Sequence, residues 1–153
     1  VQFGSTKTNI KVSNLELPKN SNKNISSKGF DDLIDITLKV QNIVALSKIN
    51  QGMVNVCAVS STAGIMILES EPALGFDISK MLEAIAPINK VYQHDNLWHD
   101  GNAYAHLKGS LVGNNITIPV VDSKAVMTFS QRIVLVDFDN KPSEREIFVS
   151  VVG

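Results

Sequence analysis

The C-terminal third of the chain alternates apolar runs with turn residues, and this pattern limits the possible folds more than any other feature. Strand-like runs lie at 117–121, 125–129, 133–138 and 146–152. The pairs Asp122-Ser123 and Asp139-Asn140 stand between members of this series, as expected of turns that join antiparallel strands. The sequence therefore predicts a largely antiparallel sheet.

Earlier segments predict further strands. Residues of one parity alternate over Thr6–Val12, which predicts an opening strand of period two. Apolar runs predict two more strands over Met53–Ser60 and Gly64–Leu68. The polar, turn-rich segment 18–28 predicts a mobile loop.

Two segments have helical spacing. Apolar residues recur at this spacing from Phe30 onward, and Gly52 follows as a C-terminal stop. Asp31 and Asp32 would then lie in the first turn, where the helix dipole favours negative charge. A second helix is predicted over Phe76–Ala86, ended by a proline. Residues 103–112 fit either a short helix or an extended segment.

Together these elements predict an α+β fold, a largely antiparallel β-sheet with two main helices, in one domain of residues 1–153. The net charge of −1, without a run of Lys or Arg, argues against a nucleic-acid partner, since phosphate backbones demand a concentrated positive field. No apolar stretch approaches the roughly 20 residues that span a bilayer. We therefore expect a cytoplasmic protein that does not contact a membrane.

All three histidines, His94, His99 and His106, fall within one short segment that also contains Asp95 and Asp100. Imidazole is the commonest metal ligand, and three or four such donors can hold a divalent ion. Zinc is the expected metal, bound through His94 and His106 with a carboxylate or water. The alternative, hydrogen-bonded loop histidines, is equally compatible with the spacing.

Hydroxyl groups gather in the segment Ser60-Ser-Thr-Ala-Gly64, between two predicted strands. Hydroxyls and backbone amides at such a turn suit an anion such as phosphate, although a plain Ser/Thr turn has the same composition. Glu69 follows the end of the next apolar run, at a sheet edge or pocket rim. The sequence lacks the CxxC, P-loop, GxGxxG and GxSxG motifs, which removes the commonest nucleotide-binding and hydrolase interpretations.

A series of short motifs resembles the YjbQ-type family. The matching residues, in chain order, are Ser60-Ser-Thr-Ala-Gly-Ile, Glu69, Tyr92-Gln-His94, Gly101-Asn-Ala-Tyr-Ala-His106-Leu-Lys, Leu111-Val-Gly113, Thr117-Ile-Pro-Val120 and Gln131. The resemblance covers roughly two-thirds of the chain, and the combination is far more specific than any single motif.

This resemblance implies a small α+β protein that forms homotrimers and has a secondary thiamine-phosphate synthase activity. That reaction joins a pyrimidine pyrophosphate to a thiazole phosphate and releases pyrophosphate. Glu69, His94 and His106 would be the catalytic residues. The residues implied to bind the phosphorylated substrate are Ser61, Thr62, Gly64, Asn102 and Gln131.

The chain departs from the family pattern at several positions, among them Thr128-Phe129 in place of Gly-Thr and Tyr104 in place of a variable histidine, and three departures bear most on the site. Ser60 stands where a histidine is usual, Leu68 replaces an asparagine, and Ser130 replaces a tryptophan. A serine cannot act as a base near neutral pH, although its hydroxyl can still bind a phosphate oxygen. We therefore expect weak activity. The alternatives are a non-catalytic trimer that binds a phosphorylated small molecule or a divalent metal, and a purely structural trimer whose site is vestigial.

Overall fold

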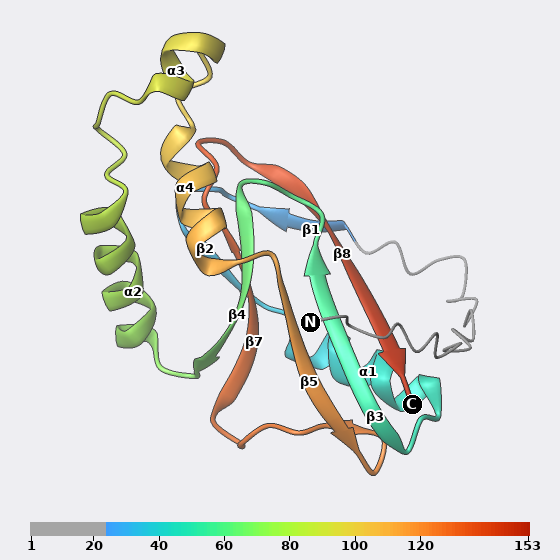
Figure 1. The fold of residues 1–153 in the computed structure, drawn as a ribbon. Coiled ribbons are helices and arrows are strands. Elements are labelled where there is room, and N and C mark those ends of the chain that lie inside the picture. Colours follow the sequence, from blue (N-terminus) through green and yellow to red (C-terminus); the bar gives the residue numbers. More distant parts are fainter. Residues whose placement is uncertain (1–23) are drawn as a thin grey trace, which may run out of the picture.

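The computed structural model describes residues 24–153, which form two β-sheets and four helices (Figure 1). The strands are β1 (Asn24–Ser27), β2 (Asp32–Asp35), β3 (Gln51–Ala58), β4 (Ala63–Glu69), β5 (Asn115–Val121), β6 (Lys124–Ala125), β7 (Gln131–Asp137) and β8 (Ser143–Val152). The helices are α1 (Thr37–Ser47), α2 (Pro72–Ile85), α3 (Gln93–Trp98) and α4 (Ala103–Val112).

The larger sheet has the strand order β1-β8-β3-β5-β6, and every neighbouring pair is antiparallel. Its central strand, β3, pairs with β5 on one side and β8 on the other. Val54, Val56 and Ala58 of β3 are fully buried. Because side chains alternate between the two faces of a strand, the intervening residues of β3 face outward.

The smaller sheet, with the order β2-β7-β4, is the middle layer of the domain. Ile133 and Leu135 of β7 belong to a core shared with α1 and the larger sheet. Val134 and Val136 of the same strand pack on the other side, in a second core with Leu82 of α2 and residues of α4. The layers are thus sheet, sheet and helices, which confirms the predicted α+β fold with its antiparallel strands and two main helices.

The predicted helix from Phe30 to Gly52 is wrong at its N-terminal end. Phe30 and Asp31 have positive φ angles of 55° and 62°, which break any helix at that point. Asp32–Asp35 then pairs with β7 as strand β2, so Asp32 is not in a helical first turn. The helix itself, α1, begins at Thr37. The prediction failed here because the apolar pair Leu33 and Ile34 is too short to distinguish helical from strand periodicity.

Other boundaries also differ from expectation. Asn24–Ser27 of the predicted 18–28 loop forms β1, paired with β8, while residues 18–23 and the predicted strand Thr6–Val12 lie outside the described residues. The open alternative at 103–112 is resolved as helix α4. The predicted strand 125–129 is reduced to the end of β6, because a hydrogen-bonded turn occupies residues 128–131.

No helix within residues 24–153 is long and apolar enough to cross a membrane.

Candidate functional site

The turn between β3 and β4 is fixed by its own hydroxyl groups. Ser60 Oγ accepts a hydrogen bond from the backbone N of Thr62 at 3.1 Å, as in other Ser turns. Thr62 is buried, and its Oγ1 donates to Asp139 Oδ2 at 3.0 Å. Two of the three hydroxyls at this turn are therefore committed to the protein itself, while the side chain of Ser61 has no hydrogen-bond partner within the described chain.

Arg145 of β8 joins this turn to two buried carboxylates. Its Nε and Nη2 donate to the two oxygens of Asp137 at 2.7 and 2.6 Å. Nη2 also donates to Asp139 Oδ2 and Thr62 Oγ1, and Nη1 donates to Ser60 Oγ, each at 3.1 Å. One guanidinium thus faces two carboxylates, so this cluster has a net negative charge and Arg145 is not available as an unpaired cation for an anionic ligand.

The titration of these groups follows from the same contacts. Burial disfavours ionisation of Asp137, but hydrogen bonds from Arg145 and from the Asp139 backbone outweigh it and lower the pKa of Asp137. Burial likewise opposes ionisation of Asp139, and hydrogen bonds from Asn140, Asn102, Thr62 and Arg145 lower the pKa of its carboxyl group. Both carboxylates are therefore charged at neutral pH.

An open pocket of about 840 Å³ lies over this cluster, and we call it the serine pocket. Its lining includes Ser60, Ser61, Thr62, Asn102, His106 and Arg145. A second hollow of about 390 Å³ shares Ser60, Ser61 and His106 and continues along α4 past Gly109. The side chains that face this space are mostly neutral hydrogen-bonding groups, which suit a polar ligand.

The two imidazoles implied by sequence come together at one end of α4. His94 of α3 and His106 of α4 have ring centroids 4.7 Å apart, at an interplanar angle of 53°. His94 Nε2 is buried without a hydrogen-bond partner, and Asp100 Oδ2 lies 3.5 Å from it. His99 is exposed at the C-terminal end of α3 and lines neither hollow. Within residues 24–153 no group of three or more His, Cys, Asp or Glu side chains could hold a metal ion.

Asn102 connects the imidazoles to the charged cluster. Its Nδ2 donates to Asp139 Oδ1 at 3.3 Å, and its backbone carbonyl accepts the amide of His106 in the first turn of α4. The same carboxylate therefore contacts Thr62, Arg145 and Asn102, from three separate segments of the chain. Asp139 thus holds the β3–β4 turn, β8 and the start of α4 in one arrangement.

Glu69 and Gln131 lie elsewhere in the chain. They are register partners at the far end of the smaller sheet, and Glu69 lines a separate hollow of about 330 Å³ with Phe76 and Arg132. Glu69 is the last of the seven residues of β4, and the six steps from Ala63 correspond to about 20 Å at the usual rise of a strand. One copy of the chain therefore does not bring Glu69 to His94 and His106.

Gly64 has a packing role. It is buried, and a Cβ atom there would lie 2.6 Å from Val112 Cγ1 and 2.9 Å from the carbonyl oxygen of Gly113. Gly64 lines neither the serine pocket nor its continuation along α4. The missing side chain lets the end of α4 lie directly on β4, and this contact helps to set the position of His106, six residues before Val112 in the same helix.

Sequence reasoning missed Arg145, Asp137 and Asp139, although the sequence contains a signal for them. Arg145 has the same parity in β8 as Ile147 and Val149, whose side chains face the core. A charged residue at an inward-facing strand position needs an ionic partner. The candidates are Asp137, the last residue of the preceding strand β7, and Asp139, just beyond the end of that strand.

The chain matches one family model over most of its length. Residues 21–153 match the family described as UPF0047 protein YjbQ-like. A UPF0047 protein of Methanothermobacter thermautotrophicus is 35% identical over 144 residues, which cover 94% of each chain. A UPF0047 protein of Archaeoglobus fulgidus is 36% identical over 121 residues, covering 79% of this chain and 91% of the relative.

Solved structures agree with this match. A YbjQ-like protein of unknown function from Sulfolobus solfataricus superposes with a TM-score of 0.78 at 33% identity, covering 86% of this chain and 95% of that one. An uncharacterised conserved protein of the YjbQ/UPF0047 family from Clostridium acetobutylicum gives a TM-score of 0.75 at 33% identity, covering 85% of this chain and 99% of that one.

Proposed function

The chain belongs to the YjbQ-like family of UPF0047 proteins, and we propose that it binds a phosphorylated small molecule in the serine pocket. The reaction proposed there is a weak thiamine-phosphate synthase-like condensation of a pyrimidine pyrophosphate with a thiazole phosphate. The observation that supports it best is the position of His106, which lines the same pocket as the hydroxyl-rich β3–β4 turn. An imidazole beside neutral hydrogen-bond donors can stabilise a departing pyrophosphate.

The groups that can contact the phosphate are those not already used by the fold. Ser61 and His106 line the pocket, and neither side chain has a hydrogen-bond partner among the described residues. Ser60 and Thr62 are instead held by Arg145 and Asp139. The ligand is therefore contacted by Ser61 and His106, while the charged cluster beneath them keeps the turn in place.

Glu69 enters this proposal only through assembly. We propose a homotrimer, as the family resemblance implies, in which the Glu69 carboxylate of one copy approaches the imidazoles of a neighbour. Glu69 has no ionic partner in residues 24–153, and its position at the far end of β4 leaves it available for such a contact. A weak rate is expected because Ser60 cannot supply the base that a histidine would.

The test is a turnover assay with the pyrimidine pyrophosphate and the thiazole phosphate, in which thiamine phosphate is measured by chromatography. His106→Ala is expected to lower the rate by about 10²–10⁴-fold, the usual effect of removing a general acid or base. His99→Ala is the matched control, because it removes an exposed imidazole that lines neither hollow. It should leave the rate unchanged.

Calorimetry with inorganic pyrophosphate separates binding from turnover. Binding that is weakened by Ser61→Ala and His106→Ala, without any turnover, would replace the enzyme proposal by the non-catalytic binding protein. Absence of both binding and turnover would contradict the phosphorylated ligand altogether.

A divalent cation, zinc in the first instance, is the second candidate ligand. The contact between His94 and His106 favours it, because the two ring centroids lie only 4.7 Å apart and imidazole is a common zinc ligand. The described chain offers two imidazoles and no complete group of three ligands, so another ligand must come from water or from a neighbouring copy. Bound zinc would supply a Lewis acid beside the pocket.

Elemental analysis of untagged protein tests this candidate. Zinc close to one equivalent per chain in the wild type and in His99→Ala, but absent from His94→Ala and His106→Ala, would support it. Equally low zinc in all four proteins would exclude it.

A further inference from the structure

Lys108 is a charged side chain that the proposed reaction does not use, although it is fully buried. Within residues 24–153 it is the only side chain of α4 that hydrogen-bonds to another element. Its Nζ donates to the two carboxylate oxygens of Asp31 at 3.1 and 3.0 Å and to Glu83 Oε2 at 3.2 Å. An ammonium group has three N–H donors, so carboxylates use all of them. We call these three residues the lysine cluster.

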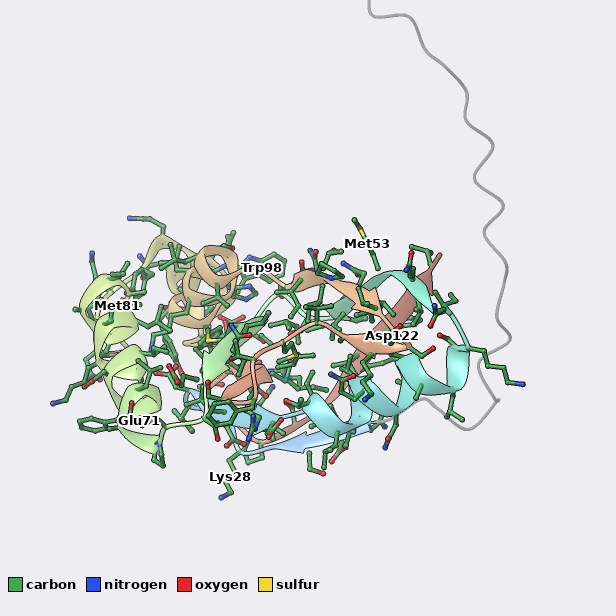
Figure 2. The ribbon with its side chains drawn as sticks, turned by 90° about the horizontal axis from the view of Figure 1, so that it is seen from below. Lys28, Met53, Glu71, Met81, Trp98 and Asp122 are labelled. Carbon is green, nitrogen blue, oxygen red and sulfur yellow. The ribbon has the colours of Figure 1, made fainter. Side chains whose placement is uncertain are left out.

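The lysine cluster joins three segments that are far apart in the sequence. Asp31 lies between β1 and β2, Glu83 in α2 and Lys108 in α4. Figure 2 shows α2, marked by Met81, beside the helices near Trp98, at the end of the molecule away from α1. Asp31 has a φ of 62°, in the left-handed region, which is unfavourable for a non-glycine residue and persists where other contacts hold it. Its contact with Lys108 is therefore maintained against a backbone cost.

The lysine cluster provides direction more than stability. Desolvation of buried ions offsets much of their attraction, so an apolar side chain would hold α4 against α2 at least as well. Leu82 and Tyr104 already supply such apolar packing between these helices. Apolar contacts have no preferred direction, whereas three hydrogen bonds to one ammonium fix its position. Setting register is the best-attested role of buried polar and ionic groups, and it fits this arrangement.

Lys108 and His106 lie on opposite sides of α4, because two residues correspond to about 200° of rotation at 3.6 residues per turn. His106 lines the serine pocket, whereas Lys108 contacts Glu83 of α2. The side chain of Asn102 and the first backbone N–H hold the N-terminal end of the helix. His106 lies between that end and Lys108, so the lysine cluster controls the rotation of the segment that carries the imidazole.

A small rotation of α4 is enough to matter. Side chains extend about 5–6 Å from the axis of a helix, so a rotation of about 10° displaces an imidazole by about 1 Å. A misplacement of about 1 Å can lower a rate by about 10²-fold. We propose that Lys108 is a positioning residue: through Asp31 and Glu83 it sets the rotation of α4 and thereby the place of the His106 imidazole in the serine pocket. Its effect on turnover rests on the proposed function, whereas its effect on the imidazole can be measured without any substrate.

The test replaces the buried ion pair by neutral groups, in the double variant Lys108→Met, Asp31→Asn. Methionine is unbranched like lysine, and asparagine tolerates the left-handed backbone at position 31. The side chain of Glu83 is 41% exposed and can turn to water. Exchange of a buried ion pair for neutral groups is often close to neutral for stability, so the variant should fold. The matched control, Lys80→Met with Asp77→Asn, makes the same two exchanges at exposed positions of α2.

Proton NMR of the full chain at one fixed pH measures the placement of the imidazole. The ring centroids of His94 and His106 are 4.7 Å apart, so a nuclear Overhauser effect between the two rings is expected in the wild type and in the control. In the double variant a displacement of about 1 Å should weaken this effect by about threefold, since it falls with the sixth power of the distance. Urea denaturation should show little change. In the turnover assay kcat should fall by about 10²-fold, and KM should change less.

A folded double variant with the wild-type Overhauser effect would overturn the positioning role, whether or not the wild type is active. An equal loss in the control would overturn it as well. If the double variant does not fold, Asp31→Asn alone decides in the same way, because it removes one carboxylate and leaves Lys108 paired with Glu83. A weakened effect in the variant, together with a wild type that has no turnover, would support the positioning role and contradict only the proposed reaction.

Discussion

Replacement of Arg145 tests whether the charged cluster beneath the serine pocket holds the site together. Arg145→Ala would leave Asp137, which is fully buried, without the guanidinium that contacts both of its oxygens. Removing one partner of a buried ion pair costs about 3–5 kcal/mol, a large part of the roughly 5–15 kcal/mol that stabilises a domain. Arg145→Lys retains the charge but cannot donate to both carboxylate oxygens of Asp137 in a fork. We therefore expect it to lower the free energy of unfolding by about 1.5–3 kcal/mol.

The assay is urea denaturation of both variants and the wild type at several pH values. The pKa of Asp137 and Asp139 is lowered in the folded wild type, so their contribution to stability is present above the ordinary value of 3.8 and is lost as pH falls through the folded pKa. In Arg145→Ala, burial is opposed only by the remaining hydrogen bonds, such as those from the Asp139 backbone and Ser143, so the pKa of Asp137 is higher than in the wild type and the variant regains part of the lost stability on protonation. The difference between the two proteins should therefore shrink as pH decreases from 7.

If Arg145→Ala lowers the free energy of unfolding by less than about 1 kcal/mol at pH 7, or if its difference from the wild type does not change with pH, this reasoning is refuted. Arg132→Ala is the control, because Arg132 is partly exposed, contacts Asp35 at 3.6 Å, and otherwise donates only to the backbone carbonyls of Phe129 and Gln131. Such surface pairs contribute about 0–1 kcal/mol.

Two further predictions concern side chains that pack around α4. Tyr104 is 1% exposed, and its hydroxyl has no hydrogen-bond partner within residues 24–153. Tyr104→Phe should therefore raise the free energy of unfolding, measured by urea denaturation, by about 1–2 kcal/mol. Burial raises the pKa of Tyr104 to about 12, so the wild type, unlike Tyr104→Phe, should also lose stability as pH rises from 10 towards 12; parallel curves would argue against it. Gly64→Ala should lower stability by about 1–3 kcal/mol because its Cβ would overlap Val112, whereas Gly75→Ala in α2 has a nearest contact of 3.2 Å and should be close to neutral in thermal melts.

The sequence predicted those parts of the fold whose signal is local. The apolar runs of β3 and β4, with hydroxyls between them, and the helical spacing of α2 are each visible within about a dozen residues. The segment 30–36 failed because its structure depends on distant partners. Asp31 contacts Lys108 of α4, and Asp32–Asp35 pairs with β7, about a hundred residues further along the chain. No periodicity in seven residues can encode such contacts.

The candidate site also has a part that could be predicted from local sequence and a part that could not. The meeting of His94 with His106 was favoured by their common segment, since α3 and α4 are joined by a few residues. Glu69 belongs to the same motif series as these histidines, yet motif order carries no information about distance in space. Once β4 is an extended strand that begins at the β3–β4 turn, its rise of about 3.3 Å per residue places Glu69 about 20 Å from that turn. A role for all three residues in one reaction therefore requires that the Glu69 carboxylate of one copy of the chain approach the imidazoles of another.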